Sequence, residues 1–528
     1  MKSCSALLFA AMLLAPNAAL AAPNATLQSA ALALDAIAAR PPFAHALVAA
    51  EVYDLDAKRP LYVHNAAALM EAASTTKLLT TGTSLALLGP NFRWTTPVYR
   101  LGTVDAGGVL HGDLVLVAAG DPNLSQRIQA DGTLAFENED HSYDGSYDTR
   151  AVPGDPLAVL RDLAAQVAKT GIKRIDGRVV IDSSLFADAG PEGGTGAIVS
   201  PVVVNDNLVD VTLTPGTNAG DAVAMSVSPQ TPYVRFVNNA KTSASKTEPT
   251  IDLSTDKSEA DGSHTVTITG TMPVGRPILY AYRVPTPNQF ARDAFTLALD
   301  AAGVTVAPPA NAPGFDRAAA AASYAPANLV ASHVSPPLSQ DVYITLKVSD
   351  NLHAALMPYM WAIYAAHAKS DLLKAGFAQE RTLLTRAGLD LRGAAQQDGL
   401  GTSAFFTPQF MVSYLAWAYR QPWYKPFWQG LPILGVDGTL FNIQNGSPAA
   451  GKVHAKTGTW GSDNLLDDNG LYTKGLAGYM TTSHGRHIAF AFYINRMAGK
   501  PSVDPSKDGA HYAGQALGEM ATEVFEKL

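Results

Sequence analysis

The segment Ser74-Thr75-Thr76-Lys77 places a hydroxyl and an amine three positions apart. Positions three apart share one face of a helix, so the two side chains can meet there. A serine attacks an acyl group when a nearby base takes its proton, and a lysine becomes that base when burial lowers its pKa. At a helix start the backbone N–H of Ser74 can also face an oxyanion. The pair therefore predicts acyl transfer through a covalent intermediate.

The spacing by itself is weak evidence, because segments 243–246 and 254–257 repeat it. Both repeats lie in polar, turn-rich stretches that no apolar helix follows. Ser74 instead leads into the apolar run 78–88, which stops at Gly89 as a helix does. The alternative for Ser74 is a helix N-cap, which would stabilise the helix by roughly 1 kcal/mol. The setting of Ser74, more than its spacing, favours the nucleophile.

Two downstream motifs supply partners for this pair. Ser349-Asp350-Asn351 lies between two segments of helical pattern, where a short loop can aim side chains into a cleft. Lys456-Thr457-Gly458 ends an extended run and predicts an edge strand, whose backbone can pair with an extended peptide. Rival copies at 462–464 and 169–171 read as an extended loop and as the capped end of a helix. The three motifs, in this order, are those of β-lactamases and penicillin-binding proteins.

The elements around these motifs suggest one domain made from both ends of the chain. A β-hairpin is predicted for residues 46–64, ahead of the Ser74 helix. From 91 to 327 short alternating segments separated by Gly, Pro and Asp predict a β-rich region with one helix, at 156–168. Helices are then expected at 339–347, 351–367, 409–419 and 512–528, and strands at 453–455, 475–480 and 487–493.

We therefore expect an α/β domain formed by residues 22–90 and 328–528, with a β-rich module inserted at 91–327. The chain runs for about 275 residues from Ser74 to Ser349, and a whole domain needs only about 100–150. A domain-sized insertion therefore fits between the first two motifs.

The N-terminus predicts export. Residues 1–21 combine a positive start, a short apolar run and the small-residue pattern Ala19-Leu20-Ala21, which indicates a cleaved signal peptide and a periplasmic product. The single cysteine, Cys4, falls in this segment, so disulfides and cysteine-based metal sites are not expected. No later stretch is apolar enough for a transmembrane anchor. The net charge of −8 and scattered basic residues argue against nucleic acid.

The chain resembles the D-alanyl-D-alanine carboxypeptidase/endopeptidase family, the class C low-molecular-mass penicillin-binding proteins, over nearly all of its length. Besides the three motifs, the resemblance rests on segments of the insertion and of the C-terminal half. These segments are Gly112-Asp113-Leu114, Gly120-Asp121-Pro122, Ile175-Asp176-Gly177, residues 431–440 and residues 455–459. It implies a penicillin-binding-protein fold, with an antiparallel sheet between helices.

The resemblance also implies roles for the site residues. Ser74 would attack the carbonyl between two terminal D-alanines of peptidoglycan stem peptides, with Lys77 as base. Ser349 would relay a proton to the leaving amine, and Asn351 would hold Lys77 and the substrate amide. Lys456 and Thr457 would bind the terminal carboxylate, next to Gly458, and the Thr459 N–H would be a second oxyanion donor. Hydrolysis of D-Ala cross-links and covalent inhibition by β-lactams follow from the same family, and no cofactor or metal is implied.

Each residue that would assist Ser74 also has a non-catalytic interpretation. Lys77 would be a solvated surface lysine, Ser349 and Asn351 helix caps, and Lys456 an exposed lysine that guards a sheet edge. For the whole protein, the alternatives are a β-lactamase or esterase with the same motifs, which the large insertion disfavours, and a non-catalytic peptidoglycan-binding scaffold. Two departures from the family pattern keep the scaffold open: Leu400 replaces a serine in segment 398–403, and residues 460–474 predict a long loop near the cleft.

The other polar clusters carry less weight. The acidic segment 137–148 lacks the ligand order of a calcium loop, so a solvated loop is expected there. His454 shares a strand face with Lys456 and is expected to be packed or solvated. No histidine pair has metal-ligand spacing.

Overall fold

A computed structural model describes residues 25–125, 127–308, 315–466, 469–500 and 509–528. The expected signal peptide, with Cys4, lies outside these residues. Within them, no helix combines the length and the apolar character that crossing a membrane requires.

The central sheet joins the two ends of the chain, as expected. Its five strands are antiparallel and follow the order β2-β1-β22-β21-β20, with Leu47 of β1 opposite Asn495 of β22. The predicted hairpin at 46–64 forms β1 and β2, and the strand that carries Lys456 is an edge strand. The strands are β1 (Leu47–Asp54), β2 (Arg59–His64), β20 (Val453–Ser462), β21 (Gly470–Thr481) and β22 (His487–Gly499).

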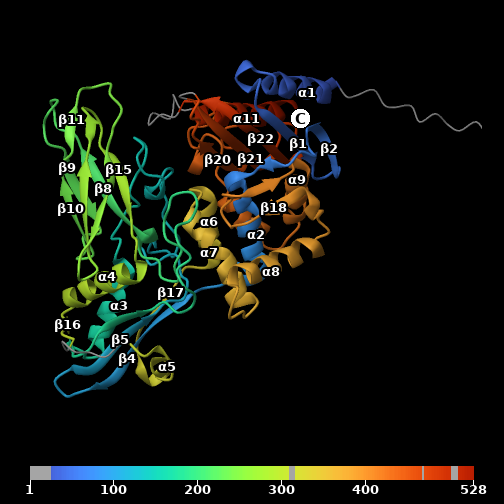
Figure 1. Ribbon diagram of the computed structural model, residues 1–528. Coiled ribbons are helices and arrows are strands. Elements are labelled where there is room, and N and C mark those ends of the chain that lie inside the picture. Colours follow the sequence, from blue (N-terminus) through green and yellow to red (C-terminus); the bar gives the residue numbers. More distant parts are fainter. Residues whose placement is uncertain (1–24, 126, 309–314, 467–468, 501–508) are drawn as a thin grey trace, which may run out of the picture.

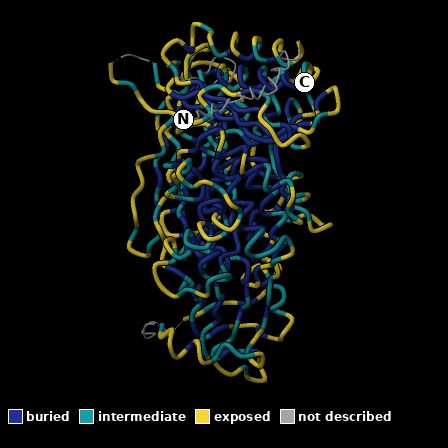
Figure 2. Tube along the Cα trace, turned by 90° about the vertical axis from the view of Figure 1, so that its right-hand side faces the viewer, coloured by how far each residue is buried: buried dark blue, intermediate teal, exposed yellow. Residues whose placement is uncertain are grey.

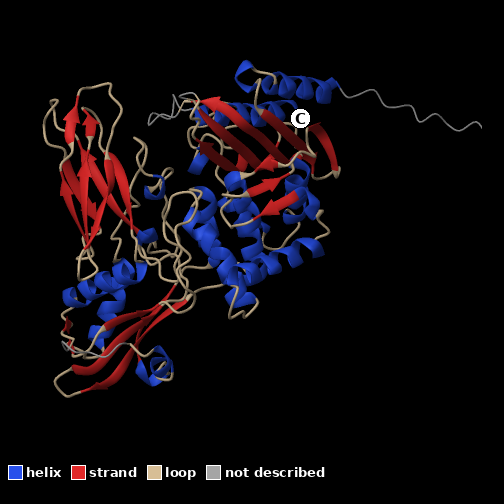
Figure 3. Cartoon of the chain, in the orientation of Figure 1, coloured by secondary structure: helices blue, strands red, loops and turns tan. Residues whose placement is uncertain are grey.

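Helices cover both faces of this sheet, which confirms the predicted fold class (Figures 1 and 3). Strand side chains alternate between the faces: Val48 and Ala50 pack with α1 and α11, and Ala49 packs with the helices opposite. Helices α1 (Ala25–Ala38) and α11 (Gly509–Lys527) cover one face, and α9 (Pro408–Ala418) and α2 (Lys77–Leu88) lie on the other. Helices α6 (Leu338–Lys347), α7 (Asn351–Met360), α8 (Leu372–Arg386) and α10 (Tyr424–Gly430) pack with α2 or with one another. A small sheet, β18 (Ala394–Gln396), β19 (Ala404–Phe406) and β3 (Met70–Glu71), lies beside them.

Strands dominate between α2 and α6, as expected, and we call residues 95–334 the middle region. Figure 1 shows it as a lobe beside the central sheet, and Figure 2 shows buried residues running through the interior of the molecule. Its larger sheet contains β4 (Thr95–Val104), β5 (Val109–Val117), β6 (Arg174–Ile175), β7 (Val179–Asp182), β16 (Thr305–Val306) and β17 (Leu329–Val334). Its smaller sheets contain β8 (Leu208–Thr214), β9 (Ala224–Ser228), β10 (Val234–Asn238), β11 (Lys241–Ser243), β12 (Asp252–Ser258), β13 (His264–Thr269), β14 (Thr271–Pro273) and β15 (Ile278–Arg283).

The middle region differs from the sequence expectation in two places. Besides the predicted helix, which is α3 (Ala158–Lys169), it contains α4 (Pro287–Ala301) and the short α5 (Arg317–Ala321). Helix α4 begins with proline at its first position and buries Phe290 and Phe295. Strand β17 pairs with β4, so the larger sheet extends past residue 327. How the chain divides into domains stays a prediction.

The long loop expected at 460–474 is mostly a hairpin. Trp460 pairs with Thr473 and Ser462 with Leu471, so β20 and β21 remain paired beyond the site. The expectation failed because the glycines and aspartates of this stretch suggest a loop, whereas pairing with the neighbouring strand supplies the backbone hydrogen bonds.

We predict that Gly478→Ala destabilises the sheet that carries Lys456. Gly478 lies opposite Ala455, and a Cβ on it would overlap the His454 carbonyl oxygen and the Ala455 backbone. Overpacking of this kind costs about 1–3 kcal/mol, so the thermal midpoint followed by tryptophan fluorescence should fall by several degrees. Gly446→Ala is the matched control, because a Cβ there meets nothing within 4 Å. Equal midpoints for both variants would contradict the prediction.

Candidate active site

Ser74 lies where a tight turn runs into an apolar helix. Residues Ala73–Thr76 form a single 3-10 turn, and α2 begins directly after it at Lys77. Ala73 has a left-handed backbone, with φ of +45°. The sequence correctly placed Ser74 at the start of the helix, and the structure adds that the serine precedes the first α-helical residue. Ser74 is only partly buried, so its hydroxyl remains accessible.

The Lys77 side chain is fully buried and connects the first two motifs. Its Nζ lies 2.9 Å from Ser74 Oγ, 2.8 Å from the Ser349 carbonyl oxygen and 3.2 Å from Ser349 Oγ, and it also donates to Asn351 Oδ1. Burial lowers the pKa of Lys77 to about 7, although the charges of nearby carboxylates, Asp350 first, oppose the shift. The solvated-lysine alternative is therefore excluded.

The Ser349-Asp350-Asn351 turn joins α6 to α7, as its sequence pattern predicted. Asp350 caps α7 by accepting the His353 backbone N–H at 2.9 Å. Ser349 has a left-handed backbone, with φ of +65°, which a serine adopts only when its surroundings hold it. The turn aims both Ser349 and Asn351 at Lys77, so these two residues do more than cap a helix.

Lys456 reaches the same serine from the edge strand. Its Nζ lies 2.8 Å from Ser349 Oγ and 2.9 Å from the Thr457 carbonyl oxygen. The side chain is 0% exposed, which excludes a solvated edge lysine. Burial holds the pKa of Lys456 well below its usual range, and the neighbouring amine of Lys77 lowers it further.

The residues that follow Lys456 on β20, Thr457 to Thr459, lie beside the Ser74 turn. Thr457 Oγ1 donates to Thr439 Oγ1 at 2.7 Å, and Thr459 Oγ1 accepts from Lys474 Nζ at 2.6 Å. A Cβ on Gly458 would overlap the carbonyl oxygen of Ala72, so only glycine lets the strand approach the Ser74 turn this closely. The eight residues predicted for the site thus come together: they contact Ser74 or Ser349, border a cavity beside Ser74 or pack against its turn.

Tyr143 is a site residue that the sequence did not reveal. Its hydroxyl donates to the Ser349 carbonyl oxygen at 2.5 Å and lies 3.2 Å from Asn351 Oδ1. It belongs to the acidic segment 137–148, so the expectation of a solvated loop is wrong. Asp140 in that segment is fully buried against Arg127, at 2.7 Å, because the pairing cation makes burial of the carboxylate possible.

Two cavities open from Ser74 and give a substrate room on both sides. The larger, of about 420 Å³, is bordered by Thr457, Thr439, Phe441, Asn138 and Glu139. The smaller, of about 310 Å³, is bordered by Asn351, Gly194, Leu400 and Trp460. Ser74, Tyr143 and Thr459 border both cavities.

The segment that departs from the family pattern packs against the Ser74 turn and borders the smaller cavity. Asp398 Oδ1 accepts the backbone N–H groups of Leu400, Gly401 and Thr402. Leu400 is 5% exposed and packs in the hydrophobic core. Gly401 has φ of +103°, and a Cβ on it would overlap the Ala73 carbonyl oxygen. The segment therefore contributes packing at this position in place of a serine hydroxyl.

The rival motifs lie away from these contacts. Segment 243–246 starts at the end of β11, and 254–257 lies in the largely exposed strand β12. Gly171 follows α3 with φ of +92°, which confirms the predicted capping. His454 stacks on Trp428 with ring centroids 4.0 Å apart, so it is a packed strand residue, as predicted.

This arrangement can transfer acyl groups. It combines a serine hydroxyl with a buried amine of lowered pKa, a second serine between two lysines, and an edge strand beside an open cleft. This fold and site define the class of penicillin-binding serine hydrolases. The chain belongs to the D-Ala-D-Ala carboxypeptidase 3 (S13) family, whose family model matches residues 30–513.

Known proteins resemble the chain over most of its length. A D-alanyl-D-alanine carboxypeptidase of Actinomadura sp. (strain R39) is 27% identical over 92% of this chain and 86% of its own. The D-alanyl-D-alanine carboxypeptidase DacB of Haemophilus influenzae is 22% identical over 82% of each chain. The crystal structure of penicillin binding protein 4 (dacB) from Haemophilus influenzae has a TM-score of 0.69 at 20% identity, covering 93% of this chain and 99% of that one, which shows the shared fold.

We predict that Gly401→Ala slows covalent labelling by a fluorescent penicillin at least tenfold. The added Cβ would overlap the Ala73 carbonyl and displace the adjacent Ser74. Small displacements of reacting groups lower the reaction rate strongly. Gly388→Ala is the matched control. It also places an alanine at a positive φ, +76°, but its Cβ would meet nothing within 4 Å. If both variants label at the wild-type rate, the Gly401 contact does not position Ser74.

Proposed function

We propose that this protein removes the terminal D-alanine of peptidoglycan stem peptides through an acyl-enzyme on Ser74. The observation that carries the proposal is the fully buried Lys77 amine, in contact with Ser74 Oγ, Ser349 and Asn351 at once. Family membership supplies the substrate class. The relatives named as D-alanyl-D-alanine carboxypeptidases support the same activity.

In the first step the neutral Lys77 amine takes the proton of Ser74 Oγ, and the oxygen attacks the carbonyl carbon between the two D-alanines. The negative charge passes to the carbonyl oxygen, and the backbone N–H groups of Ser74 and Thr459 are the proposed donors that stabilise it. The C–N bond then breaks, and Ser349 Oγ, which both lysines contact, passes its proton to the leaving amine while it takes the former Ser74 proton from the Lys77 ammonium, so Lys77 is neutral again. Water attacks the ester in the second step and restores the Ser74 hydroxyl.

Lys456 and Thr457 are proposed to hold the carboxylate of the leaving D-alanine. Lys456 is buried beside Ser349, and Thr457 borders the larger cavity, so a carboxylate there lies next to the group that protonates the leaving nitrogen. A β-lactam presents a strained amide beside a carboxylate and should acylate Ser74 through the same contacts. One Haemophilus influenzae penicillin binding protein 4 structure is described as complexed with a β-lactam.

Cross-link hydrolysis and export are part of the proposal. A D-alanyl cross-link offers the same bond with a larger leaving group, and the larger cavity beside Thr457 has room for more than one alanine. The N-terminal residues 1–21 have the composition of a signal peptide, which supports a periplasmic location, where peptidoglycan lies.

We predict that a fluorescent penicillin labels the wild-type protein covalently and that Ser74→Ala abolishes the label. The variant removes the attacking oxygen and leaves the Lys77 network largely in place. Label is read on a denaturing gel, and D-alanine release from a stem pentapeptide is measured on the same two proteins. The pentapeptide activity should disappear together with the label.

Several outcomes would redirect the proposal. An unlabelled wild type rules out the covalent mechanism, and equal label on both proteins moves the nucleophile elsewhere, with Ser243→Ala and Ser254→Ala as the next variants. Rapid turnover of penicillin without D-alanine release would identify a β-lactamase. Label without release from any stem peptide would favour a peptidoglycan-binding scaffold.

We predict that the acylation rate rises with pH up to about 7 and then levels off. Lys77 accepts a proton only when neutral, and with a pKa of about 7 its neutral fraction grows roughly tenfold per pH unit below that value. The second-order rate constant for penicillin acylation between pH 5 and 8.5 tests this. A rate independent of pH in that range would show that Lys77 is not the titrating base.

A further inference from the structure

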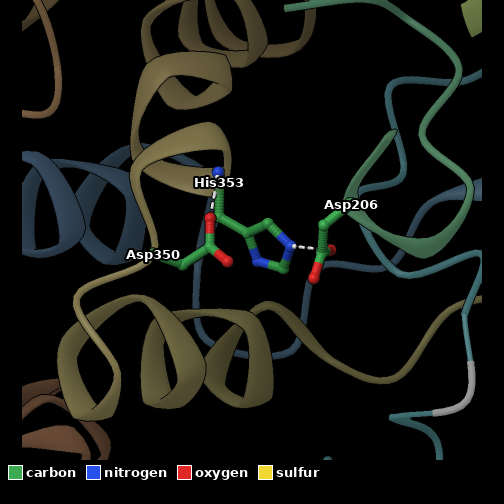
Figure 4. A group of neighbouring side chains, drawn as sticks. All are labelled: Asp206, Asp350 and His353. Carbon is green, nitrogen blue, oxygen red and sulfur yellow. Dashed lines mark hydrogen bonds and ion pairs between the residues drawn. The ribbon is translucent and has the colours of Figure 1, made fainter. Parts of the chain in front are cut away.

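A buried cluster of charged side chains lies directly behind the Ser349-Asp350-Asn351 turn, and acyl transfer as described above does not use it. Each of its members is at most 3% exposed. Part of the cluster comes from the middle region and part from α6, α7 and the turn between them, so it crosses the boundary between the two (Figure 4). The members are Arg127, Asp140, His141, Asp206 and Asp210 on one side and Asp341, Asp350 and His353 on the other.

Asp206 is the centre of this cluster. Its Oδ2 accepts from Arg127 Nη2 at 2.7 Å and lies 2.8 Å from His141 Nε2. Its Oδ1 lies 3.1 Å from His353 Nε2, which belongs to α7. Three donors thus converge on one carboxylate, and charge-assisted hydrogen bonds of this kind are about twice as strong as neutral ones.

The backbone that carries Asp206 is strained. Asn205, Asp206 and Asn207 have φ of +50°, +54° and +54°, three successive non-glycine residues in the left-handed region. Their own side chains hold the turn. Asn205 Nδ2 donates to the Leu208 carbonyl oxygen at 2.9 Å, and Asn207 Nδ2 donates to that of Ile198 at 3.0 Å. Strained backbone persists where its surroundings over-determine it, and it gathers at functional sites.

His353 transmits this contact to the turn that carries Ser349 and Asn351. Its backbone N–H donates to Asp350 Oδ1 at 2.9 Å, and its ring Nδ1 lies 2.8 Å from Asp341 Oδ1. Burial opposes a charge on the ring, yet the carboxylates of Asp350, Asp341 and Asp206 raise the pKa of His353 well above its usual range. His353 therefore connects the middle region, through its ring, to Asp350, through its backbone N–H, and Asp350 lies between Ser349 and Asn351.

A metal ion is the obvious alternative, because Asp206, Asp350 and His353 offer ligand atoms within 4.8 Å of one another. The surrounding charges disfavour it. Both ring nitrogens of His353 face carboxylates, and the Arg127 guanidinium lies 2.7 Å from Asp206 Oδ2 and 3.8 Å from Asp350 Oδ2. Arg127 already supplies the positive charge that a cation would bring.

We propose that Asp206 is a positioning residue for acyl transfer: the middle region presents it on a left-handed turn to fix His353, and through His353 the Ser349-Asp350-Asn351 turn. The inference rests on the proposed function, because it concerns how fast Ser74 is acylated. It gives the insertion a part in the chemistry without contact to substrate. Loss of the contact frees the turn, and Ser349 and Asn351 then meet Lys77 in fewer molecules at any moment.

The test compares Asp206→Asn with Asp256→Asn. Asp256 is also paired with a histidine in the middle region, His264 at 2.8 Å, but it contacts no residue of the Ser349 turn. Stopped-flow labelling with fluorescent penicillin gives the acylation rate constant and, separately, the fraction of protein that labels. We expect D206N to lower the rate constant about tenfold to a hundredfold, with D256N at the wild-type rate.

A merely structural role would lower the labelled fraction and leave the rate constant of the folded fraction unchanged, and that result would overturn the proposal. An equal loss of rate in D256N would overturn it as well. If wild type itself takes no label, the proposed function fails and this inference falls with it. Normal wild-type labelling beside an unaffected D206N rejects the inference alone.

His353→Gln removes the same contact from the catalytic side and covers the case in which D206N does not fold. The proposal predicts a similar fall in the acylation rate constant for H353Q. The double variant should be no slower than the slower single variant, because both substitutions break one connection and their effects are then not additive. Independent, multiplying losses would show that the two residues act separately and would contradict the proposal.

Discussion

The burial of one amine governs the architecture of this site. Lys77 is fully enclosed, and its Nζ is surrounded by two hydroxyls, a backbone carbonyl and an amide oxygen, none of them charged. A buried ammonium without a direct carboxylate partner loses hydration that neutral acceptors replace only in part, so the neutral amine is favoured. That neutral amine is what an attacking serine needs. Helix α2, the Ser349 turn and the edge strand β20 must all be in place to exclude water from it.

These three elements come from distant parts of the chain, and the central sheet brings them together. The pairing of β1 with β22 closes the two ends around α2 and α7, while the middle region leaves after α2 and returns before α6. The middle region does more than fill the gap. It places Tyr143 on the carbonyl of Ser349 and Asp206 against His353. The Ser349 turn therefore contacts Lys77 and Lys456 on one side and the middle region on the other.

The sequence predicted the parts of the site that local pattern determines. Ser74 was distinguished from its rivals by the apolar helix that follows, and Lys456 by an extended run that forms an edge strand. Tyr143 and Asp206 could not be found this way. Tyr143 meets a carbonyl 206 positions away, and its acidic neighbours suggest a solvated loop until Arg127 is known to pair with Asp140. Residues 205–207 have a left-handed backbone but no glycine that would indicate it in the sequence. Tertiary hydrogen bonds hold this backbone instead.

The two lysines that contact Ser349 influence each other's charge. Two ammonium groups cannot both be charged cheaply around one buried hydroxyl, and the amine of Lys77 already lowers the pKa of Lys456. Such coupling is reciprocal. In the proposed function, a substrate carboxylate beside Lys456 would favour the charged form of Lys456, and that charge would in turn favour the neutral form of Lys77. Under this proposal, binding of the C-terminal carboxylate would prepare Lys77 as the base, so a ligand that lacks a carboxylate would lose more than one electrostatic contact.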